Sequence, residues 1–338
     1  MTRSPEWPAI SPNAPSRKIG LYRYIWRTSG RAQIGLAGLS TIVFLLDLLP
    51  LELQRRIVNE AIHDHSFNAL VVLCGIYAVV AVLQGLSKLS TNIFKNSVGE
   101  AATRRLRLDT YAAALYHPEP EAGGKEGVGI SIIVSEADST GLFIATSVSE
   151  PVLHGGVLIS VFTYLIYLQP WMAAVALVLF APQFIFVPVM QNAINRRTAS
   201  RIKLLRTLSV DIVNETAEGV EERKAGPYRR RVNRVYDLNM QIYRRKFSMN
   251  FLMNLLYHFG IVGILFVGGG LVMQGSIEVG TVVAFISGLA KVNDPWQDLV
   301  AFFRDVTNTR VQFRLIANFI ADATSAPRET ETREVERV

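Results

Sequence analysis

Four ionisable side chains lie in or near apolar segments that are long enough to cross a membrane. They are Asp47, Glu150, His154 and His258. Charged groups are costly in lipid and usually face the interior of a helix bundle or water, so each is a candidate for a substrate cavity. Glu150 and His154 are four residues apart, which places them on one helix face and allows them to pair. The alternative is that Asp47 and Glu150 lie at membrane boundaries and are simply hydrated.

Other patterns that could do chemistry are weak. His63 and His65 have no third ligand nearby, so an exposed polar loop is expected there rather than a metal site. The one cysteine, Cys74, lies in an apolar run, which excludes a disulfide framework. No G-x-x-x-x-G-K-[ST] phosphate-binding sequence occurs. We therefore expect no catalytic residue, no bound cofactor and no metal in this chain.

Six apolar stretches position the ionisable groups. The chain has 338 residues, is 50% hydrophobic and has a mean hydropathy of +0.26, which is too apolar for an ordinary soluble domain. Each stretch approaches the roughly 20 apolar residues that a bilayer crossing needs. They are residues 32–51, 68–87, 146–168, 172–190, 251–273 and 281–303. The predicted fold class is an all-α membrane protein with six transmembrane helices.

Most basic residues lie at the feet of the apolar stretches. They precede the first stretch and fill the second-to-third and fourth-to-fifth connections, while residues 169–170 and 274–280 have none. By the positive-inside rule, both termini are cytoplasmic in the plasma (inner) membrane. The net charge of +7 is therefore attributed to topology and lipid contact, and no nucleic-acid partner is expected.

Two long polar segments extend the apolar stretches into the cytoplasm as helical hairpins. In residues 191–250, two arms of about 23–26 residues each would reach on the order of 35–40 Å, with Gly219 and Gly226-Pro227 bracketing the tip. The earlier hairpin follows the second stretch, stops at His117-Pro118, turns through a glycine-rich segment from Gly123 to Gly129 and resumes at about Ile130.

The two ends of the chain lack the long apolar stretches of the middle. Residues 1–16 are rich in proline and are expected to be disordered, with no cleavable signal. Residues 17–27 alternate basic and large apolar side chains, which predicts an amphipathic elbow helix on the inner membrane surface. Residues 321–338 are charged and lack apolar periodicity, so a frayed tail is expected there.

Five short stretches follow one another in a recognisable order and spacing. They are Gly129 with Asp138, residues 167–171, Gly219 with Lys224-Ala225-Gly226, residues 275–285 with Pro295, and residues 314–320. Together they resemble the transmembrane domain of exporter-type (type IV) ABC transporters, and the resemblance covers about residues 17–320. In it, the segment from Gly219 to Gly226 is similar to the second coupling loop, and Gly129 follows the first.

The resemblance implies a permease subunit, an exporter that moves substrate through a central cavity by alternating access. It implies a homodimer or a heterodimer with a second transmembrane subunit in the lipid bilayer, with the fourth and fifth helices crossing to the partner. ATP and magnesium would be bound by a separate ABC ATPase (nucleotide-binding) subunit. The coupling residues that would dock on this ATPase are Glu121, Gly123, Gly124, Lys125, Glu126, Gly219, Glu221, Glu222, Arg223 and Lys224.

Two other classes of function stay open. Both hairpin tips are more charged than is usual in the family, which slightly favours a non-transporting membrane scaffold or sensor built on a degenerate ABC transmembrane domain. A membrane enzyme that uses Glu150 and His154 is the third class. The substrate cannot be read from the sequence.

Overall fold

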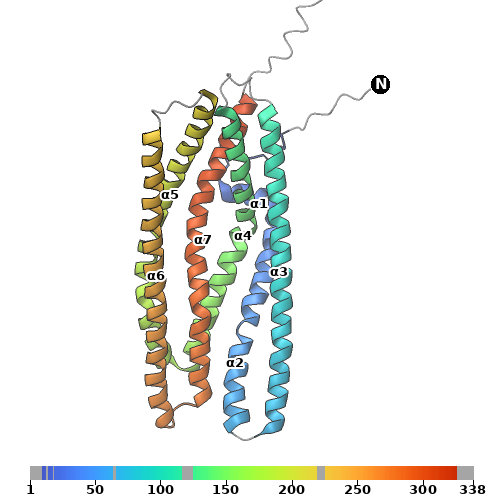
Figure 1. Cartoon of the computed structure of the whole chain (residues 1–338). Helices are drawn as coiled ribbons and strands as arrows, with labels where there is room; N and C mark the ends of the chain where they lie inside the picture. Colours follow the sequence, from blue (N-terminus) through green and yellow to red (C-terminus); the bar gives the residue numbers. More distant parts are fainter. Residues whose placement is uncertain are drawn as a thin grey trace, which may run out of the picture. The chain divides into compact units, whose positions relative to one another are not determined.

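The structure, a computed structural model, describes residues 10–12, 14–17, 19–63, 66–115, 125–218 and 225–325. Within these ranges every regular element is a helix, as Figure 1 shows. The elements are α1 (Leu21–Leu46), α2 (Leu49–Arg56), the π-helix η1 (Ile57–His63), α3 (Phe67–Leu115), α4 (Lys125–Leu168), α5 (Pro170–Glu218), α6 (Ala225–Met273) and α7 (Val279–Ser325). The predicted all-α class is confirmed.

Five helical segments are long and apolar enough to cross a membrane. They are Leu21–Glu60, Phe67–Leu115, Ser135–Leu168, Pro170–Leu205 and Tyr228–Met273. The sixth predicted crossing, residues 281–303, lies in α7 and is not among them, because Lys291, Asp294 and Asp298 interrupt its apolar run. The protein is therefore an all-α membrane protein by these criteria, and the sixth crossing stays a prediction.

The long helices confirm that helix continues well beyond the predicted apolar stretches, and they correct the boundaries of these extensions. α3, α5 and α6 have 49 residues each, or about 74 Å at 1.5 Å per residue, against a hydrocarbon core of about 30 Å. α4 begins at Lys125 rather than near Ile130, so Gly127 and Gly129 lie inside a helix and not in a turn. Gly226 and Pro227 fall in the first turn of α6 rather than in the tip, at a position where proline costs no hydrogen bond.

The described parts of both predicted tails make specific contacts. Within residues 1–16, the Ser11 N–H donates to Asp109 Oδ1 over 3.0 Å and Arg105 donates to Ser11 Oγ over 2.9 Å, and Pro15 is buried. At the other end, α7 continues to Ser325 instead of stopping at residue 320. Asp322, which was assigned to the frayed tail, forms an ion pair with Arg17. Residues 1–9 and 326–338 lie outside the described part of the chain.

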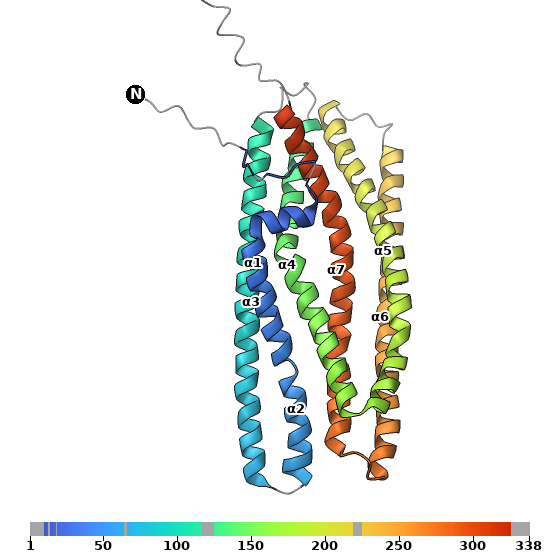
Figure 2. The same ribbon diagram turned by 180° about the vertical axis from the view of Figure 1, so that it is seen from behind.

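The elbow is present and begins later than predicted. α1 starts at Leu21 rather than at residue 17, and the backbone leaves helical geometry at Ser29 (φ −138°, ψ 20°). Figure 2 shows the change of direction that follows. Leu21, Tyr24 and Ile25 are buried at the helical spacing of an amphipathic helix, while Trp26 is half exposed.

The chain divides into two compact units. The first comprises Met1–Ile34, Phe94–Ser147 and Asp305–Val338. In it the ring of Tyr24 packs on that of Phe313 with centroids 5.1 Å apart. Its portions of α3 and α4 are joined by two hydrogen bonds from Arg107 to Asp138, of 2.7 and 2.8 Å.

The second unit comprises Gly35–Ile93 and Val148–Arg304 and holds the largest apolar core. α5 and α6 pack along each other, as both views show (Figures 1 and 2). Inside the core, Phe180, Phe184 and Trp296 meet edge to face, with the centroids of the last two 4.7 Å apart. The core joins α5 and α7 by aromatic contacts of the kind that add stability beyond area burial.

Candidate functional site

The predicted pair of Glu150 and His154 forms in the second unit. His154 Nε2 lies 2.7 Å from Glu150 Oε2 on α4, which confirms the prediction from their spacing. A third group completes what we call the His154 cluster: Asp298 Oδ2 on α7 lies 3.7 Å from His154 Nδ1. The imidazole therefore lies between two carboxylates, one on its own helix and one on α7.

A second cluster surrounds Asp47, which is largely buried. Lys88 Nζ on α3 donates to Asp47 Oδ1 over 3.0 Å. Lys291 Nζ on α7 donates to the backbone carbonyl of Asp47 over 2.7 Å and lies 3.8 Å from its carboxylate. This Asp47 cluster brings two positive charges, from α3 and α7, to one negative charge at the break between α1 and α2.

The break between α1 and α2 supplies the carbonyl that Lys291 uses. Pro50 has no N–H to continue the helical hydrogen bonds. The N–H of Leu51 donates to Leu48 O over 3.0 Å instead of to Asp47 O. The Asp47 carbonyl is thereby free to accept the ammonium group of Lys291.

The Asp47 cluster also lies beside the end of the second predicted crossing, because Lys88 directly follows it. Residues 68–87 would place Lys88 at the inner end of that crossing, whereas Asp47 was placed near the outer end of the first. The hydrogen bond between them means that the two residues lie at the same height along their neighbouring helices. Exposed apolar side chains continue along α3 beyond Ser87, at Leu89, Ile93 and Phe94. The apolar surface of α3 is therefore longer than the sequence stretch suggested.

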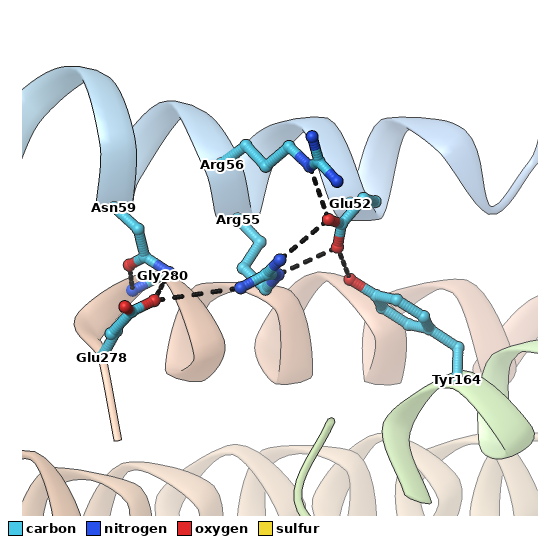
Figure 3. Close-up of polar contacts among 7 residues, drawn as sticks. All are labelled: Glu52, Arg55, Arg56, Asn59, Tyr164, Glu278 and Gly280. Carbon is cyan, nitrogen blue, oxygen red and sulfur yellow. Dashed lines mark hydrogen bonds and ion pairs between the residues drawn. The ribbon is translucent and has the colours of Figure 1, made fainter. Parts of the chain in front are cut away.

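A third cluster, which Figure 3 shows, is centred on Glu52 in α2, just past the end of the first predicted crossing. Glu52 accepts hydrogen bonds from Arg55 (2.8 and 2.9 Å), from Arg56 (2.7 Å) and from the Tyr164 hydroxyl of α4 (2.7 Å). The hydrogen bonds from Arg55 above all, and then those from Arg56 and Tyr164, outweigh burial and lower the pKa of Glu52 from 4.5 to about 2.

The Glu52 cluster extends to the start of α7. Arg55 lies 3.8 Å from Glu278, Asn59 donates to the same carboxylate, and the Gly280 N–H donates to Asn59 Oδ1 over 2.7 Å (Figure 3). A side chain at position 280 would meet the Arg55 carbonyl and Asn59, so only glycine permits this approach.

The three clusters follow one another along the same helices of the second unit. On α7 they use Asp298, then Lys291, then Gly280. The separations of seven and eleven residues correspond to roughly 10 and 16 Å of helix rise. Their sum is close to the thickness of the hydrocarbon core, about 30 Å. Charged groups are thus spaced through helices whose other side chains are mostly apolar, which suits a path for a polar solute better than a reaction centre.

The remaining predicted site residues do not join these clusters. His258 is exposed on α6, where its ring meets that of the neighbouring Tyr257. Lys125 and Glu126 form the first residues of α4, where only the backbone is described. The other proposed coupling residues lie outside the described part of the chain: Glu121, Gly123, Gly124, Gly219, Glu221, Glu222, Arg223 and Lys224. Among the described residues, no group of His, Cys, Asp and Glu side chains could hold a metal ion.

Sequence reasoning missed most partners in the clusters. Lys88, Lys291, Asp298 and Glu52 were not singled out. Lys291 and Asp298 are seven residues apart, so they share a helix face inside the sixth apolar stretch. That spacing was a usable signal for both.

The low pKa of Glu52 predicts a pH-dependent contribution to stability. Because the folded-state pKa lies below 4.5, ionised Glu52 stabilises the fold above pH 4.5, and this contribution is lost as the pH falls toward about 2. We expect the Glu52→Gln variant to melt at a lower temperature than the wild type at pH 6, and the difference to shrink as the pH is lowered. Melting curves of the purified chain at several pH values measure it, and a difference that does not depend on pH would contradict the assignment.

No protein-family model and no curated protein sequence matches this chain, so its function has to be inferred from its own residues.

Proposed function

We propose that the chain is the transmembrane permease subunit of an ATP-driven ABC transporter of the exporter type, coupled through its cytoplasmic hairpins to a separate ATPase chain. It works as a homodimer or heterodimer in the plasma (inner) membrane, with six crossings and both termini cytoplasmic. ATP and magnesium belong to the ATPase, and this chain itself performs no catalysis.

The observation that carries the proposal is the pair of helical hairpins, α3–α4 and α5–α6. Each arm is far longer than a bilayer is thick, so the hairpin ends lie well away from the apolar segments. The α3 and α4 arms are fastened by the two hydrogen bonds between Arg107 and Asp138. In the α5–α6 hairpin, Arg197 Nε donates to Gln241 Oε1 over 3.0 Å. Rigid arms of this length can transmit a movement at their tips to the apolar helices.

The three charged clusters of the second unit give further support. Ionisable groups inside apolar helices generally mark solute or ion pathways. The clusters connect α1–α2, α3, α4 and α7, so a change in helix packing would make or break ion pairs at each level. Alternating access needs such exchangeable contacts between helices.

The decisive experiment is to isolate the chain from native membranes in mild detergent and identify the ATPase that accompanies it. A Walker-motif ATPase in stoichiometric amount supports the permease. A complex that contains other membrane proteins and no ATPase would favour the alternative, a non-transporting scaffold or sensor on a degenerate ABC transmembrane domain.

A second prediction tests the coupling role of the hairpin tip that contains Glu221 and Glu222. Reversing two charges, Glu221→Lys with Glu222→Lys, is expected to reduce recovery of the ATPase several-fold or to uncouple ATP hydrolysis from transport. The arms should stay folded, because α5 and α6 pack along each other and bury Leu208, Leu238 and Ile242. Reversal of Asp237, an exposed acid on α6, is the control. Wild-type recovery and wild-type transport in the double variant would remove the coupling role from this tip.

A further inference from the structure

The bend in α1 borders a large cavity within the first unit. Its volume is about 770 Å³. Residues on both sides of Ser29 form one wall, and the α3 residues Val98, Ala101, Ala102 and Arg105 form the other. The break at Ser29 creates this space, because a straight α1 would not turn the elbow away at this point.

The lining of the cavity is basic and apolar. Arg27, Arg31 and Arg105 contribute three guanidinium groups, and no acidic residue is among the described residues that line it. Arg105 donates to Ser11 Oγ. Arg27 and Arg31 are exposed and form no ion pair with the described part of the chain. Trp26, which is 50% exposed, and Ile34, which is 64% exposed, add a large apolar surface beside them.

The cavity lies at the boundary between the apolar and polar parts of its helices. Arg31 directly precedes the first apolar stretch, and Ile34, near the start of that stretch, is exposed. On the α3 side, Val98 comes one turn after Phe94, near the end of the exposed apolar surface. Tryptophan and arginine are the side chains that favour the headgroup level of a bilayer.

From these observations we propose that this elbow cavity binds the phosphate headgroup of an anionic phospholipid of the cytoplasmic leaflet. Arg27 and Arg31 bind the phosphate oxygens, Arg105 adds positive charge from α3, and the acyl chains lie against Ile34. Guanidinium groups suit this role because they donate two parallel hydrogen bonds to a phosphate and stay charged at any physiological pH. The proposal rests on the membrane topology given under Proposed function but not on transport or on an ATPase.

The test compares lipid binding by the full chain, purified alone in detergent and mixed with equal amounts of phosphatidylglycerol and phosphatidylcholine. Native mass spectrometry counts the lipids that stay bound. The wild type should prefer phosphatidylglycerol by about 30-fold, since Arg27 and Arg31 each contribute about 1 kcal/mol near an anionic headgroup. The double variant Arg27→Gln/Arg31→Gln should lose this preference.

Two further variants separate a cavity from general electrostatics. Arg244→Gln/Arg245→Gln removes the same charge from α6 near the fifth apolar stretch and should keep the preference. Ala102→Phe fills the cavity without changing any charge and should abolish the preference. Melting curves verify that each variant is folded.

The outcomes decide the ligand as well as the site. Equal loss in the α6 variant, or full retention in Ala102→Phe, would show that the lipid is held by surface charge and would overturn the proposal. Complete displacement of phosphatidylglycerol by inorganic phosphate would assign the site to a soluble anion instead of a lipid. A chain that retains the preference but carries no ATPase would refute the proposed function and leave the lipid site standing.

Discussion

The Asp47→Asn variant is expected to unfold at a temperature several degrees below that of the wild type. The substitution leaves Lys88 and Lys291 close together with no carboxylate between them. Removing one partner of a buried ion pair costs about 3–5 kcal/mol, because the other charge stays desolvated. Half of the Lys88 side chain is exposed, so we expect the lower part of this range or somewhat less. Melting curves of the purified chain in lipid nanodiscs measure the effect.

A second substitution tests whether the unpaired charge is the cause. Asp47→Asn/Lys88→Met removes both charges of the pair, so it should recover part of the lost stability. Lys291 keeps its hydrogen bond to the Asp47 carbonyl in both variants, because the backbone is unchanged. Asp237→Asn, the same exchange at an exposed position on α6, should melt like the wild type. If the double variant melts below Asp47→Asn, the pair does not explain the loss.

The contrast between predicted and missed contacts has a physical basis. The pair Glu150–His154 was predictable because four residues along a helix fix the distance between two side chains whatever surrounds them. Asp47 and Lys291 are 244 residues apart, and their contact depends on which faces of α1 and α7 meet. A single sequence does not show which helix faces pack together. The Asp47 carbonyl at the break between α1 and α2, which accepts from Lys291, was hidden for the same reason.

The helix ends likewise include some that the sequence predicts and some that it does not. α3 stops at Leu115, close to the predicted stop before Pro118, because proline forbids a helix interior by its own geometry. The start of α4 was placed five residues late, because Gly127 and Gly129 were taken for a turn. Glycine costs a helix only about 1 kcal/mol, and the continuation of α4 outweighs that cost. The sixth crossing shows the opposite case: α7 exists as predicted, but its three charged residues keep its apolar character below that of the other five.

Gly141→Ala is expected to destabilise the first unit by about 1–3 kcal/mol, although alanine is the better helix former. Gly141 on α4 lies against Thr103 on α3, and an added Cβ would come within 2.7 Å of the Thr103 backbone N and Cα. A side chain can rotate away from such a contact, but a helix backbone cannot, so α3 and α4 must separate. Gly99 and Ala145 meet one turn further along, which makes this a close helix contact built from small residues.

Two glycines in the same helices calibrate the prediction. At Gly155 of α4 an added Cβ meets nothing within 4 Å, so Gly155→Ala should leave the melting temperature unchanged or raise it by the propensity gain of up to about 1 kcal/mol. At Gly99 of α3 the nearest atom is Ala145 Cβ at 3.3 Å, which predicts an intermediate result. The expected order of stability is therefore Gly155→Ala, then Gly99→Ala, then Gly141→Ala. Equal melting temperatures for the three variants would mean that α3 and α4 do not approach each other at Thr103. The proposed coupling depends on a rigid α3–α4 hairpin, so this result would count against it.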